Sequence, residues 1–246
     1  MIANLMMYRR PELVDVHNRY WALIRQNLAQ AGISSPVNLS QDSEEFAVWN
    51  NPNLVLSQTC GMPYRKWLHP NVTLVGTPDF GVTQCPKGYY RSAFIVRKDD
   101  PRNTLADYKD AHFTYNQEFS QSGYAAAFTH LKSLGFWFKN RTQSHQHLAS
   151  ARAVAENRAD IAALDAVTWR LITKYESFAL SLRVLIWTKP TPGLPYIAGP
   201  NADQKCSFNA IKTALSQLTT RDRDLLGIKG LIYIPSEDYL SVADPE

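Results

Sequence analysis

Small hydroxyl residues and a glycine gather in the stretch Ser120-Gln121-Ser122-Gly123, between a strand-like run at 112–116 and a helix-forming run at 124–134. A strand, a tight turn and a helix bring free backbone N–H groups and the positive end of a helix dipole to one point. That is the chemistry of an anion site. Gly123 lets a ligand approach the backbone closely, and serine hydroxyls can cap the helix or donate outward. The alternative is a capped helix that binds nothing.

Further polar side chains follow other predicted strands. These candidates are Tyr8, Ser57, Gln58, Thr59, Tyr64, Ser144, His145 and Asp165. Hydrogen-bond donors dominate the set, which suits a tetrahedral oxyanion held by hydrogen bonds and dipoles rather than by many full charges. His145 can add positive charge or a donor. Asp165 would either cap the helix after it or accept from a protonated oxyanion or a ligand amine.

Catalytic and metal chemistry have weaker support. Cys60 and His145 could pair as nucleophile and base, but nothing in the sequence marks Cys60 as activated. His145 and His147 are two residues apart in a short polar segment, which is weak evidence for a metal site. We therefore expect no catalytic residue, metal ion or cofactor.

The three cysteines, Cys60, Cys85 and Cys206, contain no C-x-x-C pair, which argues against zinc-ribbon and thioredoxin sites. Cys60 and Cys85 both lie in turn-like segments. A disulfide between them would indicate an oxidising compartment, and two free thiols are the equal alternative.

Composition limits the classes of partner. The chain has 246 residues, a net charge of +4 and scattered Lys and Arg, so no basic stripe for nucleic acid is present. No run of 18 apolar residues predicts a membrane span. The first residues lack the basic leader and apolar core of a signal peptide. A signal was removed, or the protein is made without one and is cytoplasmic if Met1 is the native start.

Apolar periodicity predicts strands alternating with helices, and therefore an α/β protein with a mostly parallel sheet. Short strands are expected at 1–5, 37–39, 53–57, 72–78, 90–97, 112–116, 161–164, 182–186 and 231–235, and helices at 11–31, 105–108, 120–134, 147–157, 167–175, 206–218, 221–226 and 236–242. The pattern breaks near 97–101 and 187–195. We expect one lobe from 1–96 and 188–246, a second from 97–187, and a ligand cleft between them.

Five motifs occur in an order that resembles one family. They are Leu56-Ser57-Gln58-Thr59-Cys60-Gly61-Met62-Pro63-Tyr64, Gly88-Tyr89-Tyr90-Arg91-Ser92, Ser120-Gln121-Ser122-Gly123-Tyr124, Ser144-His145 with 150–155, and Asp165-Ala166-Val167-Thr168-Trp169. The chain resembles the phosphate/phosphite/phosphonate substrate-binding proteins of ABC importers over most of residues 1–200. The ordered set is specific, whereas each motif alone is not.

The resemblance implies a type 2 periplasmic-binding-protein fold, with two α/β lobes, two crossing strands and closure on the ligand. In that family the Ser-x-Ser-Gly loop holds phosphonate oxygens, which matches Ser120, Ser122 and Gly123, while Gln121 stands where a threonine is frequent. The family's histidine matches His145, its acidic residue Asp165 and its aromatic residue Tyr8. The implied partners are a small oxyanion and an importer permease, and the implied location is the periplasm. We expect a monomer.

Two other functions remain open. The same fold could act as an enzyme on a small heterocyclic, thiamine-like substrate, because a fold does not determine a function. A sensor that reports ligand state to a membrane partner is the third hypothesis.

Overall fold

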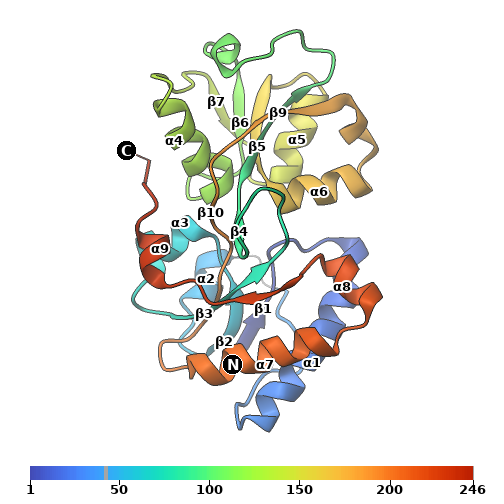
Figure 1. The fold of residues 1–246 in the computed structure, drawn as a ribbon, viewed down its shortest axis with the longest axis vertical. Helices are drawn as coiled ribbons and strands as arrows, with labels where there is room; N and C mark the ends of the chain where they lie inside the picture. Colours follow the sequence, from blue (N-terminus) through green and yellow to red (C-terminus); the bar gives the residue numbers. More distant parts are fainter. Residues whose placement is uncertain (42–43, 246) are drawn as a thin grey trace. The chain divides into compact units, whose positions relative to one another are not determined.

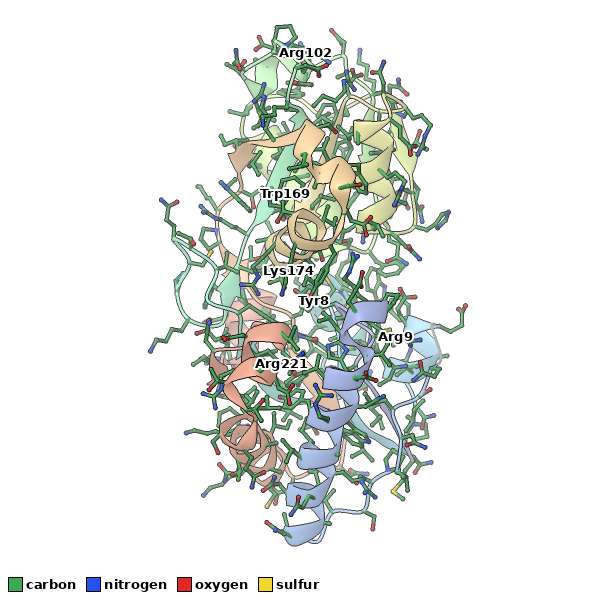
Figure 2. The ribbon with its side chains drawn as sticks, turned by 90° about the vertical axis from the view of Figure 1, so that its right-hand side faces the viewer. Tyr8, Arg9, Arg102, Trp169, Lys174 and Arg221 are labelled. Atoms are coloured by element: carbon green, nitrogen blue, oxygen red, sulfur yellow. The ribbon has the colours of Figure 1, made fainter. Side chains whose placement is uncertain are left out.

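The computed structural model describes residues 1–41 and 44–245. They form two compact units: Met1–Thr83 with Pro192–Leu240, and Gln84–Thr191 with the C-terminal segment from Ser241 (Figure 1). The chain thus leaves the first unit after Thr83 and returns to it at Pro192. Each unit is an α/β unit with its own five-stranded sheet.

The sheet of the first unit has the order β1-β2-β11-β3-β12. Its strands are β1 (Ile2–Asn4), β2 (Leu54–Gln58), β11 (Tyr196–Ala198), β3 (Thr73–Asp79) and β12 (Gly230–Ile232). β1 and β2 are parallel, whereas β11 runs antiparallel to both β2 and β3. β2 and β3 therefore point the same way, and the loops that follow β1, β2 and β3 leave from one edge of the sheet.

Two long helices pack together on this sheet, α1 (Val14–Gln30) and α7 (Gln204–Gln217) (Figure 1). A short turn η1 (Pro11–Leu13) leads into α1, and Pro11 costs no hydrogen bond there because the first N–H groups of a helix are unpaired. The buried side chains of α1 recur at helical spacing, at Val16, Tyr20, Ile24, Asn27 and Leu28. Burial of this stripe holds α1 in place.

The sheet of the second unit has the order β7-β6-β8-β5-β9. Its strands are β7 (Arg141–Gln143), β6 (Phe113–Tyr115), β8 (Ile161–Asp165), β5 (Ser92–Arg97) and β9 (Leu182–Trp187). β6 is parallel to β7 and β8, whereas β5 is antiparallel to β8 and β9.

Helices cover both faces of the second sheet. Alternate residues of β5 and β8 point to opposite faces, so Phe94 and Ala163 join one apolar cluster while Ile95 and Ala162 join another. α4 (Ala126–Lys132) packs on the first cluster, and α5 (His147–Ala155) and α6 (Ala166–Tyr175) on the second. A sheet buried on both faces is a rigid base for the loops at its edge.

The remaining described elements are short. They are α2 (Glu45–Trp49), α3 (Gly61–Pro63), η2 (Tyr64–Leu68), β4 (Tyr89–Tyr90), η3 (Leu105–Tyr108), η4 (Gln121–Ala125), η5 (Ser177–Ser181), β10 (Thr191–Pro192), α8 (Thr220–Leu226) and α9 (Ser236–Leu240). None of the helices in the described residues is long and apolar enough to cross a membrane.

Several sequence predictions differ from the structure. Residues 37–39 do not form a strand, and the sequence does not predict β7 and β11, because β7 is polar and exposed throughout and β11 is enclosed by Pro195 and Gly199. Neither sheet is mostly parallel, since antiparallel pairs make up at least half of each. β5, which the predicted boundary at residue 97 gives to the first lobe, pairs along its length with β8 and β9 of the second unit.

Candidate functional site

The parallel strands of the second unit end at one edge of its sheet. Phe113 of β6 pairs with Arg141 of β7 and with Ile161 of β8. The turn at Ser120–Gly123 follows β6, His145 follows β7, and Asp165 ends β8. The fold therefore brings the sequence-predicted groups of this unit to a single edge.

The turn after β6 begins a helix with one π-helical turn, η4, which runs without a break into α4. Ser120 is the N-cap, and its Oγ accepts a hydrogen bond from Gly123 N–H at 3.0 Å. Ser120, Gln121 and Ser122 are nearly buried, each 2–3% exposed. A π turn widens the start of a helix and is frequent at functional sites. The dipole of the whole helical run favours negative charge at this end.

Ser122 is bound by a histidine that the sequence analysis did not place in the site. Its Oγ lies 3.0 Å from Nε2 of His147, the first residue of α5. Burial lowers the pKa of His147 to about 4, an effect that the nearby carbonyl of Ala163 opposes. His147 is therefore neutral at pH 7 and adds a polar partner for Ser122 rather than a positive charge.

The structure adds a steric reason for glycine at position 123. The sequence suggested that a glycine here lets a ligand reach the backbone. In the structure, a Cβ on Gly123 would overlap Oδ1 of Asn116 and stand 3.0 Å from Cε1 of His147. The side-chain volume of Gly123 is thus filled by the protein itself, and any larger residue must displace Asn116 or His147.

His145 lies in the loop between β7 and α5. Its side chain is exposed, its φ is 67°, and its Nδ1 lies 3.2 Å from Nε2 of Gln143. The neighbouring Ser144 is tied down through its Oγ, 2.6 Å from Oγ of Ser150. Of the two histidines, the structure brings His147 and not His145 into contact with the serine turn.

Asp165 caps α6. Its Oδ1 accepts hydrogen bonds from the N–H groups of Val167 at 2.7 Å and Thr168 at 2.8 Å, and the residue is 2% exposed. The capping role is the first of the two alternatives left open by the sequence, and it satisfies orphan N–H groups at the start of α6.

In the first unit the polar segment after β2 is held by the backbone. Nε2 of Gln58 donates to the carbonyl of Leu194 at 3.0 Å, and Thr59 N–H donates to the carbonyl of Pro195 at 3.0 Å. Ser57 and Thr59 have no exposed surface, and Oγ of Ser57 has no hydrogen-bond partner among the described residues.

The two candidate tyrosines of the first unit differ. Tyr8 is partly exposed, packs edge-on against Phe80 with centroids 5.0 Å apart, and has a φ of 61°. A left-handed conformation is costly for an aromatic residue, which makes Tyr8 a candidate for a functional constraint. Tyr64 is 1% exposed and packs against Tyr239, and burial raises its pKa to about 12.

No group of three or more potential metal ligands occurs within the part of the chain that the structure describes. Cys60, Cys85 and Cys206 form no disulfide in the described part of the chain, so the bridge that the sequence left open is not present. The sequence reasoning missed Asn116 and His147. A signal existed for both, since Asn116 directly follows a predicted strand and His147 opens a helix.

Comparison with known families identifies the chain. The family model described as “ABC transporter, phosphonate, periplasmic substrate-binding protein” matches residues 71–239, which is more than half of the sequence. The chain belongs to this family. No curated protein sequence matches the chain.

Solved structures support the type 2 periplasmic-binding-protein fold. PhnD1 from Prochlorococcus marinus, in complex with methylphosphonate, is 18% identical with a TM-score of 0.72, over 92% of this chain and 90% of that chain. A binding protein component of an ABC phosphonate transporter from Pseudomonas aeruginosa is 15% identical with a TM-score of 0.69, and the match covers 97% of this chain and 83% of that chain. XAC2383 from Xanthomonas citri, bound to chloride, is 14% identical with a TM-score of 0.70, over 97% and 93%. At these identities the likeness concerns the fold.

Proposed function

We propose that the protein binds a small phosphorus oxyanion, of the phosphonate or phosphate type, and delivers it to the permease of an ABC importer. The observation that carries the proposal is the nearly buried turn Ser120–Gly123 at the positive end of the η4–α4 helix. Hydroxyl and N–H donors at a helix start suit an oxyanion that has lost its water. The family membership supports the transport role and a periplasmic location.

The proposed ligand contacts of the second unit are Ser120, Gln121 and Ser122, with Asp165 and His145 at the same sheet edge. His147 supports Ser122 through the contact between its Nε2 and Oγ of Ser122. In the first unit we propose Tyr8, which is partly exposed and conformationally constrained. The segment 57–59 and Tyr64, which are buried, complete the proposed set in this unit.

A panel of ligands tests the proposal by thermal unfolding and calorimetry. It contains methylphosphonate, phosphate, phosphite, aminoethylphosphonate, sulfate and a thiamine-like heterocycle. A ligand that binds only the folded state raises the melting temperature, so we expect a rise with a phosphorus oxyanion. A rise with the heterocycle alone would overturn the proposal and favour an enzyme or another importer class.

A further inference from the structure

Two side-chain acceptors, Oγ of Ser120 and Oδ1 of Asn116, lie beside Gly123 in the serine turn. The N–H of Gly123 donates to Oγ of Ser120 at 3.0 Å. Oδ1 of Asn116 lies where it would overlap a Cβ on Gly123, and it is buried without a hydrogen-bond partner among the described residues. A buried acceptor without a donor is costly, so a state in which it gains one is favoured.

Asn116 is held in this position by the fold. It directly follows β6, precedes the turn and is 8% exposed. Cε1 of His147 lies 3.0 Å from the same Cβ position of Gly123. The amide of Asn116 therefore remains near Gly123 whether or not Ser120 keeps its present rotamer.

We propose that Asn116 is a positioning residue whose Oδ1 takes over the Gly123 N–H when the Ser120 hydroxyl turns to a ligand. The exchange lets Ser120 leave its capping position without leaving an N–H unpaired at the helix start. The turn then has two arrangements of equal hydrogen-bond number, and an oxyanion that engages Ser120 favours the second. The ligand part of this inference rests on the proposed function.

The first test needs no ligand. Amide hydrogen exchange at Gly123 is measured by NMR in Ser120→Ala and in the double variant Ser120→Ala/Asn116→Leu. We expect Ser120→Ala to keep the protection of Gly123 within about threefold, because Asn116 replaces the lost acceptor. The double variant should lose about a further tenfold, the order of one hydrogen bond. Equal loss in both variants would show that Gly123 has no second acceptor and would overturn the inference.

Matched controls separate this role from general loosening. Ser133→Ala, at the exposed end of α4, removes a serine hydroxyl from the same helix and should leave Gly123 unchanged. A loss of Gly123 protection in Ser133→Ala equal to that in the double variant would mean that the helix frays, which also counts against the inference.

The second test uses methylphosphonate. Binding should shift the Gly123 amide resonance in the wild type, and Asn116→Leu should abolish most of that shift while Ser122 still responds. A full shift at Gly123 in Asn116→Leu would overturn the exchange. If methylphosphonate, phosphate and phosphite all fail to bind the wild type, the proposed function fails, while the ligand-free exchange test still decides the role of Asn116.

Discussion

The segment after β2 in the first unit and the turn after β6 in the second unit have similar sequences, but different kinds of contact hold them in place. Both follow a parallel strand, both are rich in hydroxyl and amide groups, and both lead into a π-helical turn. In the first unit, Gln58 and Thr59 are bonded to backbone carbonyls of the returning chain. In the second unit, Ser122 is bonded to the side chain of His147, and Asn116 fills the space beside Gly123.

Under the proposed function, this difference assigns the response to a ligand to the turn of the second unit. The sheet fixes the backbone partners of Gln58 and Thr59, so we expect the segment after β2 to be a rigid framework that keeps its conformation. Side-chain partners can exchange at small cost, so the second turn can rearrange while its helix stays in place. The experiments below test this contrast, in order of expected effect.

Gly123→Ala should have the largest effect. Its Cβ would overlap Asn116 and crowd His147, and overpacking of this kind destabilises proteins by about 3 kcal/mol at the upper end of the usual range. Urea unfolding measures the loss, and calorimetry with methylphosphonate should show that binding is lost as well. Gly230→Ala in β12 is the control, because no heavy atom lies within 4 Å of its Cβ. Equal stability of the two variants would mean that Asn116 does not hold the turn.

His147 should make stability depend on pH. Its pKa falls from 6.5 to about 4 on folding, so the unfolded chain takes up the proton first as pH falls. Stability from this residue is therefore present above pH 6.5 and is lost towards pH 4. Between pH 7 and pH 5 the loss is about 2 kcal/mol.

His147→Gln should remove that part of the pH dependence of the unfolding free energy. His145→Gln, at an exposed position, is the matched control and should keep it. Unfolding in urea at pH 7 and pH 5 gives the pH dependence of the unfolding free energy for both variants. A wild-type pH dependence in His147→Gln would mean that His147 is not buried in its neutral form. Burial also lowers the pKa of His17 to about 4, so some dependence should remain in every variant.

Substitutions of Ser122 and Ser57 should have the smallest effects on stability and the clearest contrast between the two units. Ser122→Ala leaves Nε2 of His147 without its partner, which should cost about 1 kcal/mol of stability and weaken methylphosphonate binding about tenfold. Ser57→Ala removes a hydroxyl that has no partner among the described residues and no exposed surface, so stability should stay the same or rise. A larger loss of affinity in Ser57→Ala than in Ser122→Ala would reverse the assignment of framework and responsive turn.

Much of the fold follows from local patterns in the sequence. The stripe of α1, the continuous apolar run of β8 and the capping position of Asp165 are all readable, because each depends on neighbours along the chain. β7 carries no apolar residue and β11 lies in a proline-rich connection, so neither shows a strand pattern, and their pairing is decided by distant strands. For the same reason the sequence overestimates the parallel character of both sheets.

The sequence predicts the serine turn of the candidate site, but not the side chains that contact this turn. Ser120, Ser122 and Gly123 form a recognisable motif with a local mechanism. The contacts of Asn116 and His147 depend on packing between segments far apart in the sequence, which residue spacing does not encode. The contact of His147 with Ser122 was missed in this way, because His145 and His147 follow the same strand and only the start of α5 separates them.

The position of β11 bears on the order in which the chain can fold during synthesis. All strands of the second sheet lie within Ser92–Trp187, whereas the first sheet has β11, formed after residue 195, between β2 and β3. The second unit can therefore complete its sheet while the first still lacks its middle strand. A chain that ends after Thr191 should protect residues 92–187 from limited proteolysis and leave residues 54–79 sensitive. Equal protection of both segments would show that β2 and β3 can fold stably before β11 is inserted between them.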